Sequence, residues 1–281
     1  MLHDPSRGLT RREALAAGAA TLGALAIGAR RSTADDATGR YGPFKMGLQS
    51  YSLRHYKRDE ALAKTKELGV HYWESFSAHI PADASRAAEA REAAKAAGVE
   101  VIGFGVTRFT KDADASRKVF GFARAMGIGY LSADPDPDAF DSLDRLVEEY
   151  GIPIGIHPHG PGHRWNTIDK ISAAIKDHHE KIGLCNDTGH LLRSGQDPVR
   201  AVEVFGKRTY GVHLKDVKDA KTFTILGRGD LRLNDLLKAL AAIEYSYCLA
   251  LEYEENEDDP IADIRACLDA VAKSASGLKP A

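Results

Sequence analysis

Short runs of apolar residues recur along the chain, and most of them end on a histidine or a carboxylate. The runs begin near Lys45, His71, Val99, Ile128, Ile154, Ile182, Tyr210 and Tyr247. Segments with helical periodicity lie between them, for example residues 58–68, 83–97, 141–150 and 233–243. Strands that alternate with helices in this way build a parallel sheet.

Several predicted helices end on a glycine just before the next apolar run, at Gly69, Gly98, Gly127 and Gly151. Glycine is the usual left-handed cap at a helix C-terminus. Eight strand–helix units over residues 43–276 match the count and length of a (β/α)₈ TIM barrel. A doubly wound open sheet is the alternative, but no glycine-rich dinucleotide fingerprint follows the first strand.

The N-terminus has the pattern of an export signal rather than of a fold element. Arg11 and Arg12 form an arginine pair ahead of a weakly apolar, Ala/Gly-rich stretch over residues 16–29. We predict a twin-arginine (Tat) signal over residues 1–34 and a polar linker over 32–42, which implies a periplasmic or other extracytoplasmic location. The alternatives are an Ala-rich helix or a membrane anchor. A run this short and Gly-rich spans a bilayer poorly, so no stable membrane span is expected after signal removal.

Composition supports one large domain and argues against nucleic acid as a partner. The chain has 281 residues, 43% of them hydrophobic, and a formal net charge of −2. Residues 1–31 hold five arginines against two acidic residues, so removing them would shift the net charge to −5. An acidic domain is a poor match to a phosphate backbone. The three cysteines give no disulfide framework, and two lie in predicted buried strands.

The polar residues at the ends of the last four predicted strands are candidate metal ligands. They are His157, Asp187, His213 and Glu252. In a parallel barrel these strand ends converge on one face, where active sites of this fold are found. Two histidines and two carboxylates suit Zn²⁺, Mn²⁺ or Co²⁺, with Mg²⁺ still open, better than they suit Ca²⁺. Singly, Asp187 could cap a helix, and each histidine could be an ordinary core residue. Four consecutive strand ends together favour one divalent ion.

Other polar residues near the strand ends are candidates for binding substrate. His159 and His190 lie close to the presumed ligands in sequence, and Glu74 ends the second strand. Trp165 is a lid residue that stacks on a sugar ring or, equally, a loop anchor. Arg228 lies between two glycines and could reach an anionic group.

Lys215 shares a strand face with His213, because residues two apart on a strand point the same way. It could hold a developing oxyanion or a carboxylate. An ion pair with Asp216 or Glu252 is the competing interpretation.

Three segments carry a resemblance to a known family: Asp187-Thr-Gly-His190, His213-Leu-Lys-Asp216 and Leu251-Glu-Tyr-Glu254. The chain from Met46 to Glu254 resembles the xylose isomerase-like TIM barrels, often called sugar phosphate isomerases/epimerases. The resemblance implies that Asp187, His213 and Glu252 bind metal and that His190 contacts substrate.

The chain departs from the ketose 3-epimerases of this superfamily at the fifth strand. There those enzymes supply a glutamate that exchanges a proton opposite the eighth-strand glutamate, whereas His157 stands at this position. This departure weakens the case for a two-carboxylate epimerisation mechanism, and it leaves Glu252, His159 or Lys215 as the possible proton carriers. Related abasic-site endonucleases need further histidines on early strands, where this chain has Glu74 and apolar residues, so a nuclease is rejected.

The sequence therefore predicts a metal-dependent isomerase or epimerase acting on a small sugar or polyol. A lyase, dehydratase or hydrolase on keto-sugars, and a non-catalytic sugar-binding barrel, remain as alternatives. No glycine-rich anion cradle with a lysine is found, and export favours unphosphorylated sugars. The sequence leaves the oligomeric state open, a homo-oligomer included.

Overall fold

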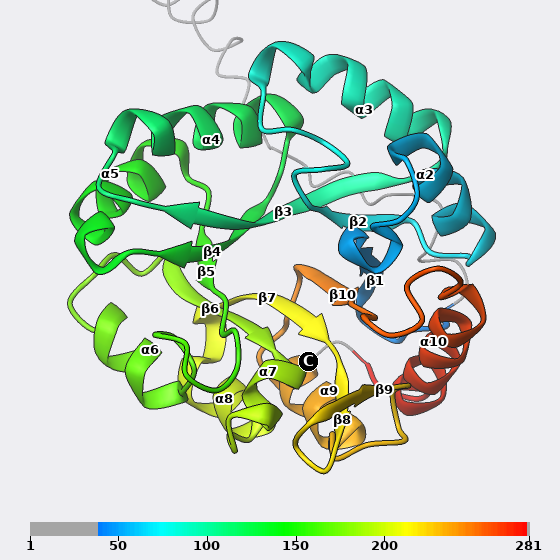
Figure 1. Ribbon diagram of the computed structural model, residues 1–281. Coiled ribbons are helices and arrows are strands. Elements are labelled where there is room, and N and C mark those ends of the chain that lie inside the picture. Colours follow the sequence, from blue (N-terminus) through cyan, green and yellow to red (C-terminus); the bar gives the residue numbers. More distant parts are fainter. Residues whose placement is uncertain (1–38, 280–281) are drawn as a thin grey trace, which may run out of the picture. The chain divides into compact units, whose positions relative to one another are not determined.

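The eight apolar runs form eight parallel strands that close into a barrel within residues 39–279, the part of the chain that the computed structural model describes (Figure 1). Around the ring the strands follow the order β1, β10, β7, β6, β5, β4, β3, β2. Their bounds are Lys45–Gln49 (β1), Tyr72–Ser75 (β2), Glu100–Phe109 (β3), Tyr130–Pro135 (β4), Ile154–Ile156 (β5), Ile182–Asp187 (β6), Thr209–Leu214 (β7) and Cys248–Leu251 (β10). The prediction of a (β/α)₈ barrel is confirmed.

Helices surround the barrel on its outside (Figure 1). Their bounds are Arg58–Glu67 (α2), Ala87–Ala96 (α3), Ala113–Met126 (α4), Phe140–Tyr150 (α5), Ile168–Ile175 (α6), Thr188–Arg193 (α7), Pro198–Phe205 (α8), Leu233–Ala242 (α9) and Ile261–Ala275 (α10). An antiparallel ribbon of β8 (Asp216–Lys218) and β9 (Thr222–Thr224) follows β7. This ribbon was not predicted, because strands of three residues leave too short a pattern.

Glycines punctuate the helix-to-strand connections as expected. Gly69, Gly98, Gly127 and Gly151 all adopt left-handed backbone, with φ between 71° and 75°. An L side chain is strained in that region, which explains glycine at these helix ends. Each cap turns the chain back toward the barrel, so that the next strand can pair in parallel with its neighbour.

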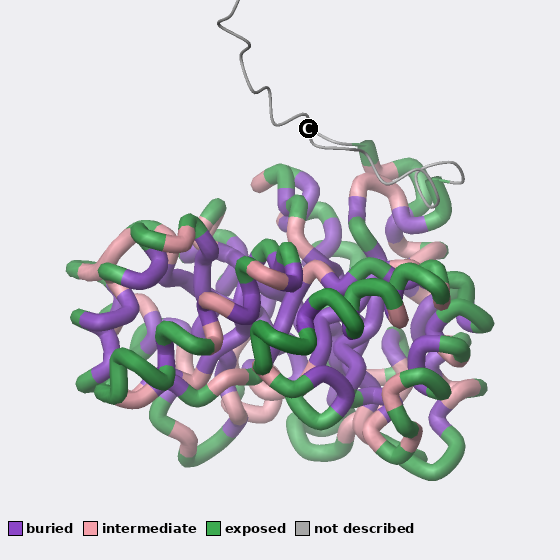
Figure 2. The backbone as a smooth tube through the Cα atoms, turned by 90° about the horizontal axis from the view of Figure 1, so that it is seen from above, coloured by how far each residue is buried: buried purple, intermediate pink, exposed green. Residues whose placement is uncertain are grey.

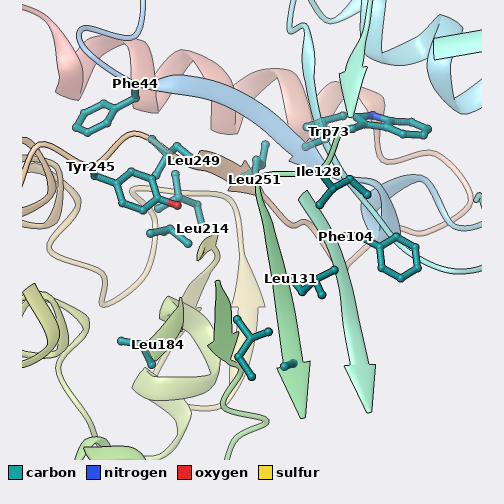
Figure 3. Packing of buried hydrophobic residues seen from close by; sticks show 14 of the residues in the cluster. Phe44, Trp73, Phe104, Ile128, Leu131, Leu184, Leu214, Tyr245, Leu249 and Leu251 are labelled. Atoms are coloured by element: carbon teal, nitrogen blue, oxygen red, sulfur yellow. The ribbon is translucent and has the colours of Figure 1, made fainter. Parts of the chain in front are cut away.

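Successive side chains along each strand point alternately to the two faces of the barrel wall, and this separates two apolar regions. In β10, Leu249 and Leu251 pack in the large cluster between strands and helices, while Cys248 and Ala250 belong to a second, smaller cluster with Tyr130. Because successive side chains of a strand point to opposite faces, the smaller cluster fills the barrel interior. Figure 3 shows the leucines of the larger cluster, and Figure 2 shows that the buried backbone lies inside the layer of exposed helices and loops.

The three cysteines are buried and free. Burial raises the pKa of the Cys185 thiol to about 12, so this thiol is neutral and has little nucleophilic character. Their burial without disulfides indicates a role in packing.

The predicted export signal over residues 1–34 and most of the linker over residues 32–42 lie outside the described residues. Within residues 39–279, no helix has both the length and the apolar character needed to cross a bilayer.

Candidate metal centre

Four neighbouring strands bring the predicted ligands together at one end of the barrel. Asp187 ends β6 and stands in register with His213 of β7. His213 is in turn in register with Ala250 of β10, and Glu252 follows two residues later on the same face. His157 comes directly after β5, which pairs with β6. The four side chains therefore form a contiguous arc around the ring.

The arc is tight enough to share one cation. One donor atom from each of the four residues lies within 4.8 Å of every other. His157 Nε2 is 3.0 Å from Asp187 Oδ2 and 3.1 Å from His213 Nδ1, and His213 Nδ1 is 3.0 Å from Glu252 Oε2. All four residues are buried, with 9% exposure at most. Converging acceptors of this kind need a proton or a metal between them.

The donor set fits a divalent transition ion. Two imidazole nitrogens and two carboxylate oxygens are ligands that Zn²⁺ and its neighbours accept in protein sites. Glu252 Oε2 is buried and makes no hydrogen bond of acceptable geometry among the described residues. A buried carboxylate oxygen left without a hydrogen bond is costly unless a cation satisfies it. The Lys215 ammonium, 3.1 Å away, supplies part of that charge, and a metal ion would add to it. The residues present therefore fit a metal ion.

Lys215 supplies a cation within the same cluster. Its Nζ lies 3.0 Å from Asp187 Oδ2 and 3.1 Å from Glu252 Oε2, and it donates a hydrogen bond to Glu254. Burial lowers the pKa of this lysine, but the three carboxylates outweigh burial and hold the pKa above its ordinary value. Asp216 is not its partner, because that carboxylate accepts backbone N–H groups of the loop after β9. Of the two predicted ion pairs, only the one with Glu252 forms.

A buried carboxylate fixes the orientation of His213. Glu74 Oε1 lies 2.8 Å from His213 Nε2, which leaves Nδ1 facing the other ligands. Glu74 has no exposed surface, and it also accepts hydrogen bonds from Gln49, Tyr130 and Ser132. This corrects the expectation that Glu74 binds substrate hydroxyls, because its oxygens are already bonded inside the barrel. An outer carboxylate of this kind increases the basicity of a ligating histidine.

Asp187 has both of the roles that the sequence left open. Its Oδ1 accepts a hydrogen bond of 2.8 Å from the backbone N–H of His190 and caps α7, while Oδ2 faces the candidate metal position. The glycine of the Asp187-Thr-Gly-His190 segment also has a steric reason. A Cβ built on Gly189 would lie 2.6 Å from Lys215 Cβ and 2.8 Å from Phe223 Cε1. Glycine therefore lets the start of α7 approach Lys215.

A cavity of about 320 Å³ opens onto the centre. Its size falls in the range of small-molecule sites. The lining residues are Gln49, Tyr51, Phe76, Ser77, Gly105, Val106, His157, His159, His190, Lys215, Glu252 and Glu254. Sequence reasoning missed Gln49 and Glu254, although Gln49 ends the first strand and Glu254 lies two residues beyond Glu252.

Two histidines and an aromatic pair shape the cavity. Burial lowers the pKa of both His159 and His190, so their imidazoles are neutral near pH 7 and can accept protons. Tyr51 and Phe76 meet edge to face with ring centroids 5.5 Å apart. Aromatic faces of this kind suit the apolar face of a sugar ring.

Two predicted substrate contacts lie elsewhere. Trp165 is 6% exposed, donates through Nε1 to Pro135 O at 2.9 Å and packs on Phe140, so it is the loop anchor rather than a lid over the cavity. Arg228 is exposed and lines a different depression beside α10, together with Lys273. The expectation that Arg228 binds substrate at this centre is therefore corrected, because Arg228 lines that other depression and is absent from the lining of this cavity.

Comparison with known proteins gives one family for this fold and centre. The sequence model of the xylose isomerase-like TIM barrel family matches residues 62–271. An inosose dehydratase of Clostridium beijerinckii is 30% identical over 139 residues, which are 42% of this chain and 46% of that enzyme. The chain thus matches less than half the length of this curated relative.

Solved structures share the fold at low sequence identity. D-psicose 3-epimerase from Clostridium cellulolyticum H10, determined with D-tagatose, superposes with a TM-score of 0.67 at 14% identity over 84% of this chain and 100% of its own. The IOLI protein, determined with a zinc atom, superposes with a TM-score of 0.66 at 16% identity over 84% and 99%. At these identities the likeness shows the fold alone.

Proposed function

The chain belongs to the xylose isomerase-like TIM barrel family, and we propose that it is a divalent-metal-dependent enzyme that moves a proton on a carbon next to a carbonyl or hydroxyl group of a sugar or polyol. The observation that carries this proposal is the convergence of His157, Asp187, His213 and Glu252 beneath a cavity of small-molecule size. The zinc atom of the IOLI protein and the sugar bound by the epimerase neighbour support it.

The four donors would hold the cation, with Glu74 fixing the His213 ring from behind. A divalent ion bound there supplies Lewis acidity, which lowers the pKa of a C–H bond next to a carbonyl. The protein's own residues then divide the proton transfer between them. The protonated Lys215 ammonium faces the cavity and is positioned to donate a hydrogen bond to an oxygen that gains negative charge.

The neutral His159 imidazole and the Glu252 carboxylate are the candidate proton acceptors, and His190 lines the cavity as a substrate contact. The base takes the proton from the carbon, and the electron pair of the broken C–H bond forms the double bond of an enol. Isomerisation follows when the former carbonyl carbon takes up the proton, while its oxygen keeps a proton as a hydroxyl and the neighbouring hydroxyl gives up its own proton to become the new carbonyl. Delivery of a proton to the same carbon from the opposite face, by a second group such as Lys215, inverts that centre, which makes the enzyme an epimerase.

Dehydration is the second candidate, and two observations favour it. The fifth-strand position holds His157, whose ring is buried against Asp187 and His213, so no carboxylate faces the substrate from that strand. The curated relative is named as an inosose dehydratase. In this reaction the electron pair of the enol expels a hydroxide from the adjacent carbon, which leaves as water with a proton from an acid such as Lys215.

The charge of the cavity favours unphosphorylated substrates. Lys215 is the cationic side chain among the described lining residues, and Asp187, Glu252 and Glu254 already neutralise it. Apart from the metal ion, no unpaired lysine or arginine lines the described part of the cavity to bind a phosphate dianion. A neutral sugar, keto-sugar or cyclic polyol ketone needs no such partner.

Metal analysis followed by turnover in D₂O tests the proposal. The purified protein, supplied with Zn²⁺, Mn²⁺ or Co²⁺, is incubated with free sugars, keto-sugars and inososes. Deuterium incorporation with an unchanged formula indicates an isomerase or epimerase, and loss of one water indicates a dehydratase. Asp187→Asn should abolish turnover and metal binding at this centre, whereas Asp177→Asn, on a carboxylate that is 81% exposed, should abolish neither.

Substrate binding without any exchange by the metal-loaded protein would instead indicate a sugar-binding barrel. Failure to retain any metal after supplementation would rule out the proposed centre.

A further inference from the structure

We propose that Asp134, His159 and His163 form a second, weaker site for a divalent transition cation beside the centre already described. One donor atom from each of these residues lies within 4.8 Å of the others. Two imidazoles and one carboxylate are a donor set that binds such ions with positions left for water or another ligand. This inference goes beyond the proposed function, which needs only one cation.

Two unpartnered atoms point to a missing ligand at this cluster. Asp134 Oδ1 and His159 Nδ1 are both buried and have no hydrogen-bond partner among the described residues. The remaining contacts are long: His163 Nε2 lies 3.5 Å from Asp134 Oδ2, and Arg164 Nε lies 3.9 Å from Asp134 Oδ1. Buried polar atoms are usually bonded, so a cation between these donors would remove two exceptions at once.

The loop after β5 is shaped to bring the two histidines together. Gly160 and Gly162 adopt left-handed backbone, with φ of 85° and 84°. These turns fold the segment so that the rings of His159 and His163 lie 4.6 Å apart. Trp165 ties the end of the loop to Pro135 O, the residue that follows Asp134. The anchor therefore fixes the loop next to the carboxylate, before any ion binds.

The surrounding charges leave room for a cation. Arg164 is a competing positive charge, but its guanidinium is paired with Asp136 at 2.5 Å, and the Lys215 ammonium is held by the carboxylates of the first centre. The Asp134 and His163 side chains keep 18% and 26% of their surface exposed, so an ion can reach them from solvent. Partial exposure and three protein donors predict weaker binding here than at the buried four-donor centre.

The second site would change the assignment of the proton acceptor. The His159 ring stacks edge to face against His157 with centroids 4.5 Å apart, so the two clusters are adjacent. A cation held by His159 would occupy the lone pair that this imidazole needs to accept a proton. Glu252 would then be the proton acceptor, and the second cation would lie at the edge of the substrate cavity.

Metal stoichiometry tests the inference without using turnover. The purified protein is stripped of metal and titrated with Co²⁺, with visible absorption and elemental analysis as readouts. The expected result is two equivalents, bound in a tight and a weaker phase. His163→Ala and Asp134→Asn should each remove the weaker phase, lowering its affinity by at least about 100-fold, above the loss typical of an outer partner.

Matched variants separate this site from the first. Asp187→Asn should remove the tight phase and leave the weaker one, so failure of the proposed function does not imply failure here. His71→Ala removes a histidine that contacts Gly98 O away from both clusters, and should keep two equivalents. One equivalent in the unaltered protein, or two equivalents in a folded His163→Ala protein, would overturn the second site.

Discussion

Replacement of Lys215 by methionine is the sharpest test of the charge balance at the centre. Methionine keeps most of the aliphatic stem but removes the ammonium between Asp187, Glu252 and Glu254. Two carboxylates whose oxygens lie within 4.8 Å repel by about 3 kcal/mol at an effective dielectric of about 20. This repulsion is present in the parent too, where the Lys215 ammonium offsets it. Breaking a buried ion pair by removing one partner costs about 3–5 kcal/mol, which is the loss expected for Lys215→Met.

The metal-free variant should therefore unfold at a much lower temperature than the metal-free parent. For a domain of this size the loss corresponds to a fall in the unfolding midpoint on the order of 6–20 °C. A divalent cation neutralises the same carboxylates, so it should raise the midpoint of Lys215→Met more than that of the parent. Differential scanning calorimetry with and without Zn²⁺ measures both effects.

Two further observations check the physical reason. Lys176 is 69% exposed and, within residues 39–279, pairs with Asp177 alone, so Lys176→Met should leave the midpoint unchanged with and without Zn²⁺. Acidification that protonates Asp187 or Glu252 should reduce the difference in unfolding midpoint between Lys215→Met and the parent, because the two carboxylates then no longer repel each other. If metal-free Lys215→Met is as stable as the parent and Zn²⁺ shifts both equally, the carboxylates do not depend on this lysine and the reasoning fails.

Three other predictions follow from contacts of the same centre. Glu74→Gln should weaken metal binding by about 10–100-fold, measured by competition with a chelator, because the partner of His213 Nε2 loses its charge; unchanged affinity would refute this role. Gly189→Ala should destabilise the protein by about 1–3 kcal/mol in denaturant unfolding, because its Cβ would lie 2.6 Å from Lys215 Cβ. Gly121→Ala is the control: Gly121 lies in α4, and its Cβ would come no closer than 4.0 Å to another group, so this change should not destabilise the protein. Burial lowers the pKa of His213, but the neighbouring carboxylates outweigh burial and raise this pKa above its ordinary value. Protonated His213 therefore stabilises the metal-free protein at a pH below the pKa of the unfolded chain, and this stability is lost as the pH rises through the pKa of the folded protein. Metal affinity should rise over the same interval as the ring loses its proton, and a calorimetric titration showing affinity independent of pH would contradict this.

The sequence by itself determined the barrel and the four candidate ligands. Both depend on local patterns: apolar runs with helices between them, glycines at helix ends, and polar residues at strand ends. Parallel strands place their carboxyl ends on one face, so His157, Asp187, His213 and Glu252 meet whenever the barrel closes. That step needs strand order and parallel direction, not atomic detail. The export signal over residues 1–34 stays a prediction.

Only the tertiary structure decided which other polar side chains reach the cavity. Glu74 ends its strand much as Asp187 does, but it lies behind His213, while Arg228 is carried to another depression. The pairing of Lys215 with Glu254, and the meeting of Asp134 with His163, join residues far apart along the chain. Rotamers and loop paths fix such contacts, and these depend on packing against distant elements rather than on periodicity along the chain.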